Sequence, residues 1–307
     1  MFLSVIIPCY RETKEQLNRC LNSLGFLTSI CEWEAWIVDD GSPNHQAQAW
    51  VAERNDEHLH CICQTNQGQS VARNNALEKA EGEYIALLDA DDEWIPEEYV
   101  KLIQILQEQH PDLLGLRWKQ TTVPYYDGSA IQFIQEEDIN PAAWGYIYRK
   151  KAIGDLRYTP GIFHEDEEFN TLLHLRTERL IMTPIAAYHY HNNPESTVRT
   201  LNKQRLEKRF NDFLGVVGRM QAESTLHQEL QRRVHVMAMC FIADLLQSAP
   251  SRTFLFNKLN DLKKLKLYPL PPYKGIKRYG WIRPLTFLKS LCYLENRIIR
   301  TFRSIRN

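Results

Sequence analysis

The sequence predicts an α/β fold in which helices cover a mostly parallel sheet. Three observations point to it: short apolar runs alternate with helical patterns over about the first 110 residues, one run is apolar throughout, and acidic residues follow two of the runs. The fully apolar run at residues 84–88 suits a strand of a parallel sheet, because both faces of such a strand are covered. Ligands of open α/β sheets bind at the carboxyl ends of the strands.

Four strand–helix units follow one another at the start of the chain. Strands are expected at residues 3–7, 33–38, 58–63 and 84–88, and helices at residues 12–24, 46–53, 69–80 and 96–109. Leu17, Leu21 and Leu24 form one stripe of the first helix, which Gly25 ends, and Pro96 suits the first turn of the fourth. This order predicts a doubly wound sheet.

The pattern changes after Pro111 to that of a mixed sheet. Short strands are expected at residues 113–117, 131–134, 144–148, 180–182 and 185–190, and a helix begins near Glu165. From about Leu201 the chain has the pattern of helices only. We therefore expect two domains: an α/β domain over residues 1–200 and a helical extension over residues 201–307.

The composition excludes several classes of protein. Lys and Arg number 37 and Asp and Glu 38, so the molecule as a whole is not built to bind nucleic acid. Seven cysteines form no CxxC pair, which predicts buried thiols in a reducing compartment and no zinc site made by cysteines. No basic leader precedes the first apolar run, and no run reaches the roughly 18 apolar residues that span a bilayer. The expected location is the cytoplasm.

A basic segment lies near the end of the sequence. From Lys274 to Arg306 there are nine Lys or Arg residues and a single acid, Glu295. Apolar residues such as Leu291 and Ile298 recur there at helical spacing. One interpretation is a basic amphipathic helix on the anionic inner face of the plasma membrane. The alternative is a helix packed on its own domain or on a second subunit, as in a homodimer.

Two strands of the predicted sheet end in carboxylates. Asp39 and Asp40 follow the second strand, and Asp89, Asp91 and Asp92 follow the fourth. Like charges this close repel unless a proton or cation lies among them, and Mg²⁺ prefers such oxygen ligands together with phosphates. A carboxylate of the first group can accept from a nucleobase imide or a ribose hydroxyl. The alternative explanation of that group is a turn with a helix cap.

Four further side chains are candidates for binding or catalysis. Arg73, near a helix start, can face a nucleotide or pair with a nearby acid. Asp166 lies three residues before Phe169 on the core-facing stripe, where burial and neighbouring acids would raise the pKa of a general base; acids are also simply favoured in a first helical turn. His189 and His191 share one strand face, as surface histidines or as ligands of a metal or diphosphate.

Five motifs occur in an order that is more specific than any one of them. They are SVIIPCY at residues 4–10, VDDGS at 38–42, NxGxxxARN at 66–74, DADDxW at 89–94 and EDxxF at 165–169. Together they resemble the family 2 inverting glycosyltransferases with the GT-A fold, of the kind that builds bacterial surface polysaccharides. The resemblance covers residues 1 to about 200 and implies a Rossmann-like, mostly parallel mixed sheet.

The resemblance implies a nucleotide site made by residues from four of these motifs. Pro8 and Tyr10 line the pocket, and Asp40 or its neighbour Asp39 contacts the uracil. Arg73 lies near the base, and Asp89 approaches the ribose.

The resemblance also implies the groups that carry the chemistry. Asp91 binds Mn²⁺ or Mg²⁺ on the diphosphate, His191 stands where an Arg is more common and is assigned to the same metal, and Asp166 is the catalytic base. The sequence departs from the family at Arg11, where an Asn often follows the tyrosine.

The expected activity is metal-dependent, inverting transfer of a sugar from a UDP-sugar to a hydroxyl of a glycan or lipid-linked saccharide acceptor. A nucleotidyltransferase would need a Gly-rich basic loop after the first strand, where this chain has Cys9-Tyr10-Arg11-Glu12. A phospho-acceptor signalling domain would end after about 120 residues and leave the EDxxF motif unexplained. A catalytically silent fold-mate that binds a partner is the third alternative.

Overall fold

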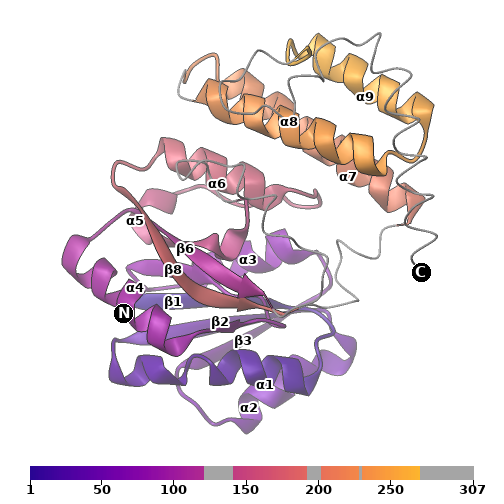
Figure 1. The fold of residues 1–307 in the computed structure, drawn as a ribbon. Coiled ribbons are helices and arrows are strands. Elements are labelled where there is room, and N and C mark those ends of the chain that lie inside the picture. Colours follow the sequence, from indigo (N-terminus) through magenta and orange to yellow (C-terminus); the bar gives the residue numbers. More distant parts are fainter. Residues whose placement is uncertain (121–140, 192–201, 228–229, 270–307) are drawn as a thin grey trace. The chain divides into compact units, whose positions relative to one another are not determined.

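The computed structural model describes residues 1–120, 141–191, 202–227 and 230–269 (Figure 1). The strand predicted at residues 131–134 and the basic segment from Lys274 lie outside the described residues. By its internal contacts the chain divides into two compact units, Met1–Ser196 and Thr197–Asn307, and each is described by itself.

The first unit is built on a mixed sheet of eight strands. In chain order they are β1 (Leu3–Cys9), β2 (Trp33–Asp40), β3 (Leu59–Gln64), β4 (Tyr84–Leu87), β5 (Glu93–Trp94), β6 (Leu113–Gln120), β7 (Tyr146–Arg149) and β8 (Leu180–Tyr190). In the sheet they lie in the order β3-β2-β1-β4-β7-β6-β8-β5. The pairs β1–β2, β2–β3, β1–β4 and β6–β8 are parallel, and the other three are antiparallel. The predicted α/β class is confirmed.

Helices cover both faces of this sheet (Figure 1). Helices α1 (Lys14–Asn22), α2 (Gln46–Glu53) and α4 (Pro96–Gln109) pack on one face, where their apolar side chains join those of Leu3, Val5 and Ile7. Helices α3 (Gln69–Lys79), α5 (Lys150–Ile153) and α6 (Glu165–Leu175) pack on the other, around Ile6 and Ile85. Alternate residues of β1 therefore point into two cores, as the period of a strand requires.

Strand β4, which was predicted from the unbroken apolar run at residues 84–88, is buried as that run predicted. Every residue from Tyr84 to Leu88 is at most 3% exposed, because β4 lies inside the sheet and is covered on both faces. Leu88 follows β4 and Asp89 follows Leu88, so the acids start where the apolar run ends.

Two features of the sheet differ from the prediction. Strand β5 is only two residues long, which is too short to leave a pattern in the sequence. The two short strands expected at residues 180–182 and 185–190 are one strand, β8, which continues through Pro184. Its register against β6 shifts between Gly115 and Arg117, and such an irregularity tolerates a residue without an N–H donor.

The second unit, in the part that the structure describes, is helical. It contains α7 (Lys203–Glu223), α8 (Leu230–Ser248) and α9 (Arg252–Lys264). Phe210 and Phe213 of α7 meet Phe241 of α8 edge to face, with ring centroids 5.8 and 5.6 Å apart. None of the described helices has the length and apolar character needed to cross a bilayer.

Candidate active site

Arg73 joins two motifs that are far apart in the sequence. Its Nη1 donates to Glu165 Oε1 at 2.8 Å, and its Nη2 lies 3.7 Å from Asp89 Oδ1. The guanidinium also faces the ring of Tyr158, 5.3 Å from its centroid, and the side chain is only 4% exposed. Arg73 on α3 thus brings the acidic end of β4 next to the start of α6, so that Asp91 and Asp166 each lie within two residues of a partner of the same cation.

The acids that follow β4 have different surroundings. Asp92 is fully buried and accepts from the Tyr188 hydroxyl at 2.7 Å and from the His191 backbone N–H at 2.6 Å. Burial and the charges of Asp89 and Asp91 raise the pKa of Asp92 to about 9. Burial also raises the pKa of Asp89 to about 6, an effect that Arg73 opposes. Asp92 therefore ties this segment to the end of β8.

The backbone of Asp91 is held by a residue of α1. Its carbonyl oxygen accepts a hydrogen bond from Arg19 of α1. The Asp91 side chain is partly exposed, whereas the side chain of Asp92 is buried. A run of three carboxylates with at least one accessible member fits a hard divalent cation, which takes oxygen ligands.

The two acids after β2 have different partners as well. Asp40 accepts from Gln64 Nε2 at 2.7 Å and from the backbone N–H groups of Gln67 and Gly68 at 2.7 and 2.8 Å. Its carboxylate is therefore occupied in holding the loop between β3 and α3. The turn that follows is tight: Gly41 has φ of +78°, and a Cβ there would lie 2.6 Å from the backbone nitrogen of Asn66.

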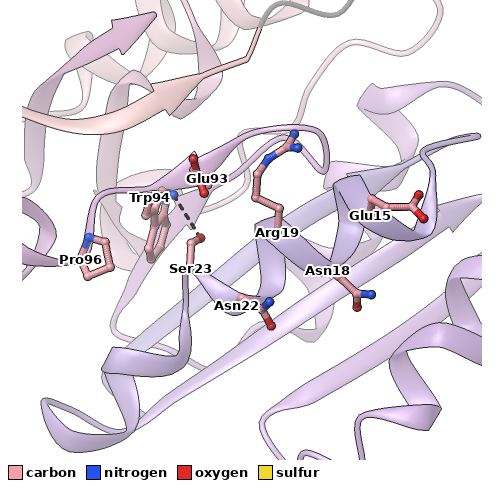
Figure 2. Close-up of a pocket in the computed structure, with 8 residues that line it drawn as sticks. All are labelled: Glu15, Asn18, Arg19, Asn22, Ser23, Glu93, Trp94 and Pro96. Atoms are coloured by element: carbon pink, nitrogen blue, oxygen red, sulfur yellow. Dashed lines mark hydrogen bonds between the residues drawn. The ribbon is translucent and has the colours of Figure 1, made fainter. Parts of the chain in front are cut away.

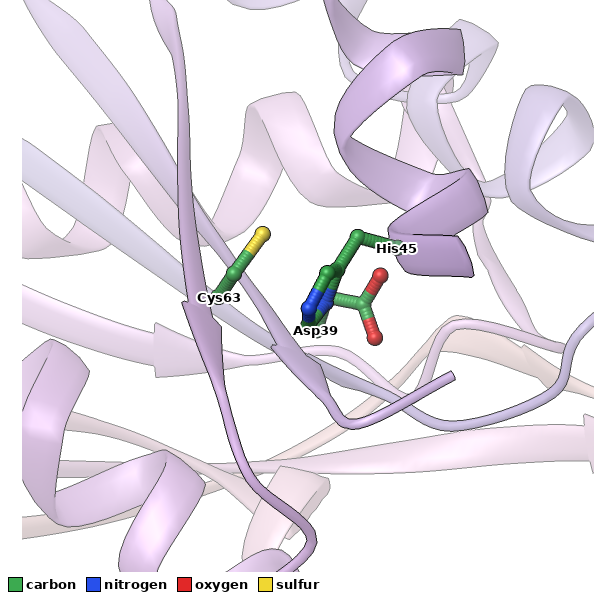
Figure 3. A group of neighbouring side chains, drawn as sticks. All are labelled: Asp39, His45 and Cys63. Carbon is green, nitrogen blue, oxygen red and sulfur yellow. The ribbon is translucent and has the colours of Figure 1, made fainter. Parts of the chain in front are cut away.

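Asp39 keeps one oxygen available in a buried position. Its Oδ1 accepts from the Ser42 N–H at 2.7 Å, whereas Oδ2 is buried without a hydrogen-bond partner among the described residues. Figure 3 shows Cys63 and His45 beside it, and ligand atoms of the three residues lie within 4.8 Å of one another. Burial and the charge of Asp39 raise the pKa of the Cys63 thiol.

The segment after β1 lies beside this turn. Cys9 pairs with Asp39 in the sheet, and the Arg11 N–H donates to Ser42 Oγ at 3.1 Å. Tyr10 is one of the few large apolar side chains that are exposed, at 41%. Arg11 has φ of +68°, in the left-handed region that Asn tolerates better than most residues.

The start of α6 carries the predicted base. Asp166 is partly exposed and its Oδ1 accepts from the Glu167 N–H at 2.8 Å. Burial of the carboxyl and the charge of Glu165 raise the pKa of Asp166 well above its ordinary value, while Arg73 acts in the opposite direction. A partly exposed carboxylate with a raised pKa has the properties of a general base.

The two histidines of β8 share a carboxylate. Glu93 of β5 is paired with His189 across the strands, and its Oε1 lies 2.9 Å from His189 Nδ1 and 2.9 Å from His191 Nε2. The prediction that His191 shares an ion with Asp91 stays a prediction, and the contacts of its ring favour Glu93 and His189 as its partners.

An open pocket of 470 Å³ lies on the α1 side of this region (Figure 2). Its lining residues come from α1 and from the β5 segment: Glu15, Asn18, Arg19, Asn22, Ser23, Glu93, Trp94 and Pro96. The Trp94 N–H donates to Ser23 Oγ at 3.1 Å and fixes one wall. None of the residues predicted to hold the nucleotide lines it.

Sequence reasoning missed Glu165 and Glu93. Glu165 is 2% exposed and accepts from Gln69 at 2.5 Å as well as from Arg73, so it is an internal counterion rather than a surface acid of a helix start. Arg73 correspondingly lies in a buried ion pair, and its predicted place near the base stays a prediction. The sequence feature that could have identified Glu165 was its position next to Asp166 in the EDxxF motif. No pattern in the neighbouring sequence identified Glu93 as a functional residue.

Comparison with known proteins gives the class. Residues 4–164 match the family model described as "Glycosyl transferase family 2", and because this is more than half of the chain, the chain belongs to that family. The predicted resemblance to the family 2 glycosyltransferases is confirmed.

Curated relatives carry glycosyltransferase names. The uncharacterised glycosyltransferase YibD of Escherichia coli (strain K12) is 27% identical over 66% of this chain and 67% of its own length. GlyA of Streptococcus pneumoniae is 24% identical over 98% of this chain, and EpsJ of Bacillus subtilis is 26% identical over 67%. The chain spans 47% of GlyA and 65% of EpsJ.

Solved structures show the same GT-A fold. Residues 1–349 of S. aureus TarS, crystallised with UDP-GlcNAc, superpose with a TM-score of 0.70 at 20% identity, covering 95% of this chain and 86% of that one. The mannosyltransferase PcManGT from Pyrobaculum calidifontis, in complex with GDP-Man and Mn²⁺, gives a TM-score of 0.57 at 15% identity, covering 96% and 86%.

Proposed function

We propose that this chain transfers a sugar, with inversion and with the help of a divalent metal, from a UDP-sugar to a hydroxyl of a glycan or lipid-linked saccharide in surface polysaccharide synthesis. The observation that carries the proposal is the contact of Arg73 with both Asp89 and Glu165, which gathers the DADDxW and EDxxF motifs at one place. TarS was crystallised with UDP-GlcNAc and PcManGT with GDP-Man and Mn²⁺, which supports a nucleotide-sugar donor.

The uracil is assigned to Asp39. Its buried Oδ2 has no hydrogen-bond partner among the described residues, and a uracil imide N–H is a donor that would satisfy it. Asp40, which the sequence left as an equal choice, already accepts three hydrogen bonds. Pro8 lies at the end of β1 next to this position, and the exposed ring of Tyr10 offers a face on which a base can stack.

The diphosphate is assigned to the acids after β4. Asp91 would hold Mn²⁺ or Mg²⁺, which neutralises charge that develops on the leaving diphosphate. Asp89, 3.7 Å from Arg73, is assigned to the ribose, while Asp92 keeps the segment in place through Tyr188 and His191. Arg73 acts as a positioning residue, because its charge is used by Glu165 and Asp89 inside the protein.

Asp166 is assigned to the proton of the acceptor hydroxyl. A carboxylate with a raised pKa accepts this proton as the acceptor oxygen attacks the anomeric carbon, and such general-base help is typically worth about 10²–10⁴-fold in rate. A single base on the acceptor side, opposite the leaving diphosphate, leads to inversion at that carbon. Retention would need a different arrangement of groups.

The test compares three variants with a panel of UDP-sugars and Mn²⁺. Asp91→Ala should abolish both donor hydrolysis and nucleotide affinity, whereas Asp166→Asn should keep nucleotide affinity, measured by calorimetry, and lose turnover. Asp155→Asn is the control, because its side chain is 90% exposed and pairs only with Arg176 among its described contacts. Full turnover by Asp166→Asn would refute the base. Binding of UDP without any turnover by the unaltered chain would favour the catalytically silent alternative.

The basic segment from Lys274 is assigned to an anionic membrane surface, which would hold the enzyme at the inner face of the plasma membrane. The support is its excess of Lys and Arg. A flotation assay with anionic liposomes compares the full chain with one cut at Leu270. Equal behaviour of the two would end this assignment.

A further inference from the structure

We propose that Glu93, His189 and His191 form a binding site for a divalent transition-metal ion of the Zn²⁺ type, with a ligand set separate from Asp91. The three side chains offer one carboxylate oxygen and two imidazole nitrogens, and these atoms lie within 4.8 Å of one another. Two histidines and one carboxylate are a common protein ligand set for Zn²⁺, and they leave a fourth position open. The inference does not depend on the proposed transfer reaction.

The distances suit such an ion. Zn²⁺ stands about 2.0–2.1 Å from its nitrogen and oxygen ligands, so tetrahedral ligand atoms lie roughly 3.3–3.4 Å apart. Glu93 Oε1 is 2.9 Å from His189 Nδ1 and 2.9 Å from His191 Nε2. Movements of a few tenths of an ångström would open this group to the spacing that the ion requires, which rotation of the side chains can supply.

The backbone fixes these ligands on one side of the sheet. Glu93 and His189 are direct partners in the antiparallel pair β5–β8, and His191 follows His189 by two residues, so it points the same way. Asp92 strengthens this arrangement, because it accepts from the Tyr188 hydroxyl and the His191 N–H on either side of His189. The ligands are therefore held by hydrogen bonds that are independent of any ion.

The donor types separate this site from the one assigned to Asp91. Imidazole nitrogen favours Zn²⁺, Co²⁺ and similar ions, whereas carboxylates and phosphate favour Mg²⁺ and Mn²⁺. The side chains of the trio are between 22 and 29% exposed, so an ion can reach them from solvent. A bound ion would link β8 directly to the segment that carries Asp91 and would stabilise the native state, which alone has the complete site.

The test uses Co²⁺ as a spectroscopic substitute for Zn²⁺. The full-length protein is treated with a chelator, dialysed and titrated with Co²⁺ without any nucleotide. We expect one equivalent to give the visible absorption of a histidine-bound ion and to raise the unfolding temperature, and we expect Zn²⁺ to displace it. His189→Ala, His191→Ala and Glu93→Gln should each weaken Co²⁺ binding at least tenfold.

Two control variants show which site is filled. His60→Ala removes a histidine that also lies near a carboxylate, Glu34 at 4.0 Å, but outside the trio, and it should bind Co²⁺ normally. Asp91→Ala should also keep the signal, even though it abolishes turnover in the proposed function. The proposal is overturned if Co²⁺ does not bind, if His189→Ala binds it as well as the unaltered chain, or if Asp91→Ala loses it. If Glu93, His189 and His191 are held together only by hydrogen bonds, Co²⁺ will not bind.

Discussion

Arg73 and Glu165 form an ion pair of 2.8 Å although 92 positions separate them in the chain. Their side chains are 4 and 3% exposed, so neither charge has much contact with solvent. The pair links α3, on the first half of the sheet, to the start of α6, where the proposed base lies. Its strength therefore bears on both stability and the geometry of the site.

Arg73→Gln should destabilise the protein strongly. The substitution leaves Glu165 buried without its cation, and breaking a buried ion pair in this way typically costs about 3–5 kcal/mol. Urea unfolding followed by circular dichroism measures the change. Arg149→Gln is the matched control, because it removes an arginine that pairs with Glu83 at 2.9 Å at the surface, where such a pair is worth about 0–1 kcal/mol. Equal losses in the two variants would contradict the assigned role.

Tyr188→Phe should loosen the acidic segment after β4. The hydroxyl donates to Asp92 at 2.7 Å and accepts from the Asp89 N–H at 3.2 Å, and both groups would lose a partner in a buried place. Leaving such groups unsatisfied costs about 1–3 kcal/mol.

Tyr84→Phe provides the comparison for this variant. Tyr84 is equally buried, but its hydroxyl has no hydrogen-bond partner among the described residues, so its removal should leave the unfolding free energy nearly unchanged. A loss for Tyr84→Phe as large as that for Tyr188→Phe would show that the contacts of the Tyr188 hydroxyl do not matter.

The sequence predicted the strands and the acidic ends for reasons that act locally. An unbroken apolar run such as residues 84–88 is favoured where both faces of a strand are covered. The acids that follow such a strand then lie at the carboxyl ends of the strands, where α/β sheets bind ligands. The partner of Arg73 could not be predicted from spacing, because helical periodicity relates residues three or four apart and Glu165 is 92 away. Glu93 was missed for a similar reason: β5 has two residues and exists only through its pairing with β8.

Asp39→Asn and Asp40→Asn should have different effects although the residues are neighbours. Asp39→Asn removes the buried acceptor assigned to uracil and should weaken UDP binding by roughly 5–150-fold, the equivalent of about 1–3 kcal/mol, in calorimetry. Asp40→Asn disturbs three hydrogen bonds that hold the loop before α3 and should lower the free energy of unfolding. Loss of UDP affinity in Asp40→Asn alone would reverse the assignment.

The rate of transfer should fall at low pH. Asp166 must be ionised to accept a proton, and burial and the charge of Glu165 raise its pKa, so kcat/KM should decrease as the pH drops through that raised value. Glu165→Gln removes the neighbouring negative charge that raises the pKa of Asp166, and it leaves Asp89 as the remaining acidic partner of Arg73, whose charge lowers that pKa. The substitution therefore lowers the pKa of Asp166. The acidic limb of the pH–rate profile should therefore move to lower pH. An unmoved limb, in a variant that unfolding shows to be native, would exclude Asp166 as the titrating group.

The turn at Gly41 makes the residue allowed at position 41 depend on the backbone at position 66. A Cβ at position 41 would lie 2.6 Å from the backbone nitrogen of Asn66, whose side chain in turn donates to the Asp40 carbonyl at 3.0 Å. Since the obstacle is main chain, no exchange of the amino acid at 66 can relieve it. Descendant sequences should therefore retain glycine at 41, or acquire a side chain there only together with an insertion or deletion in the loop around 66.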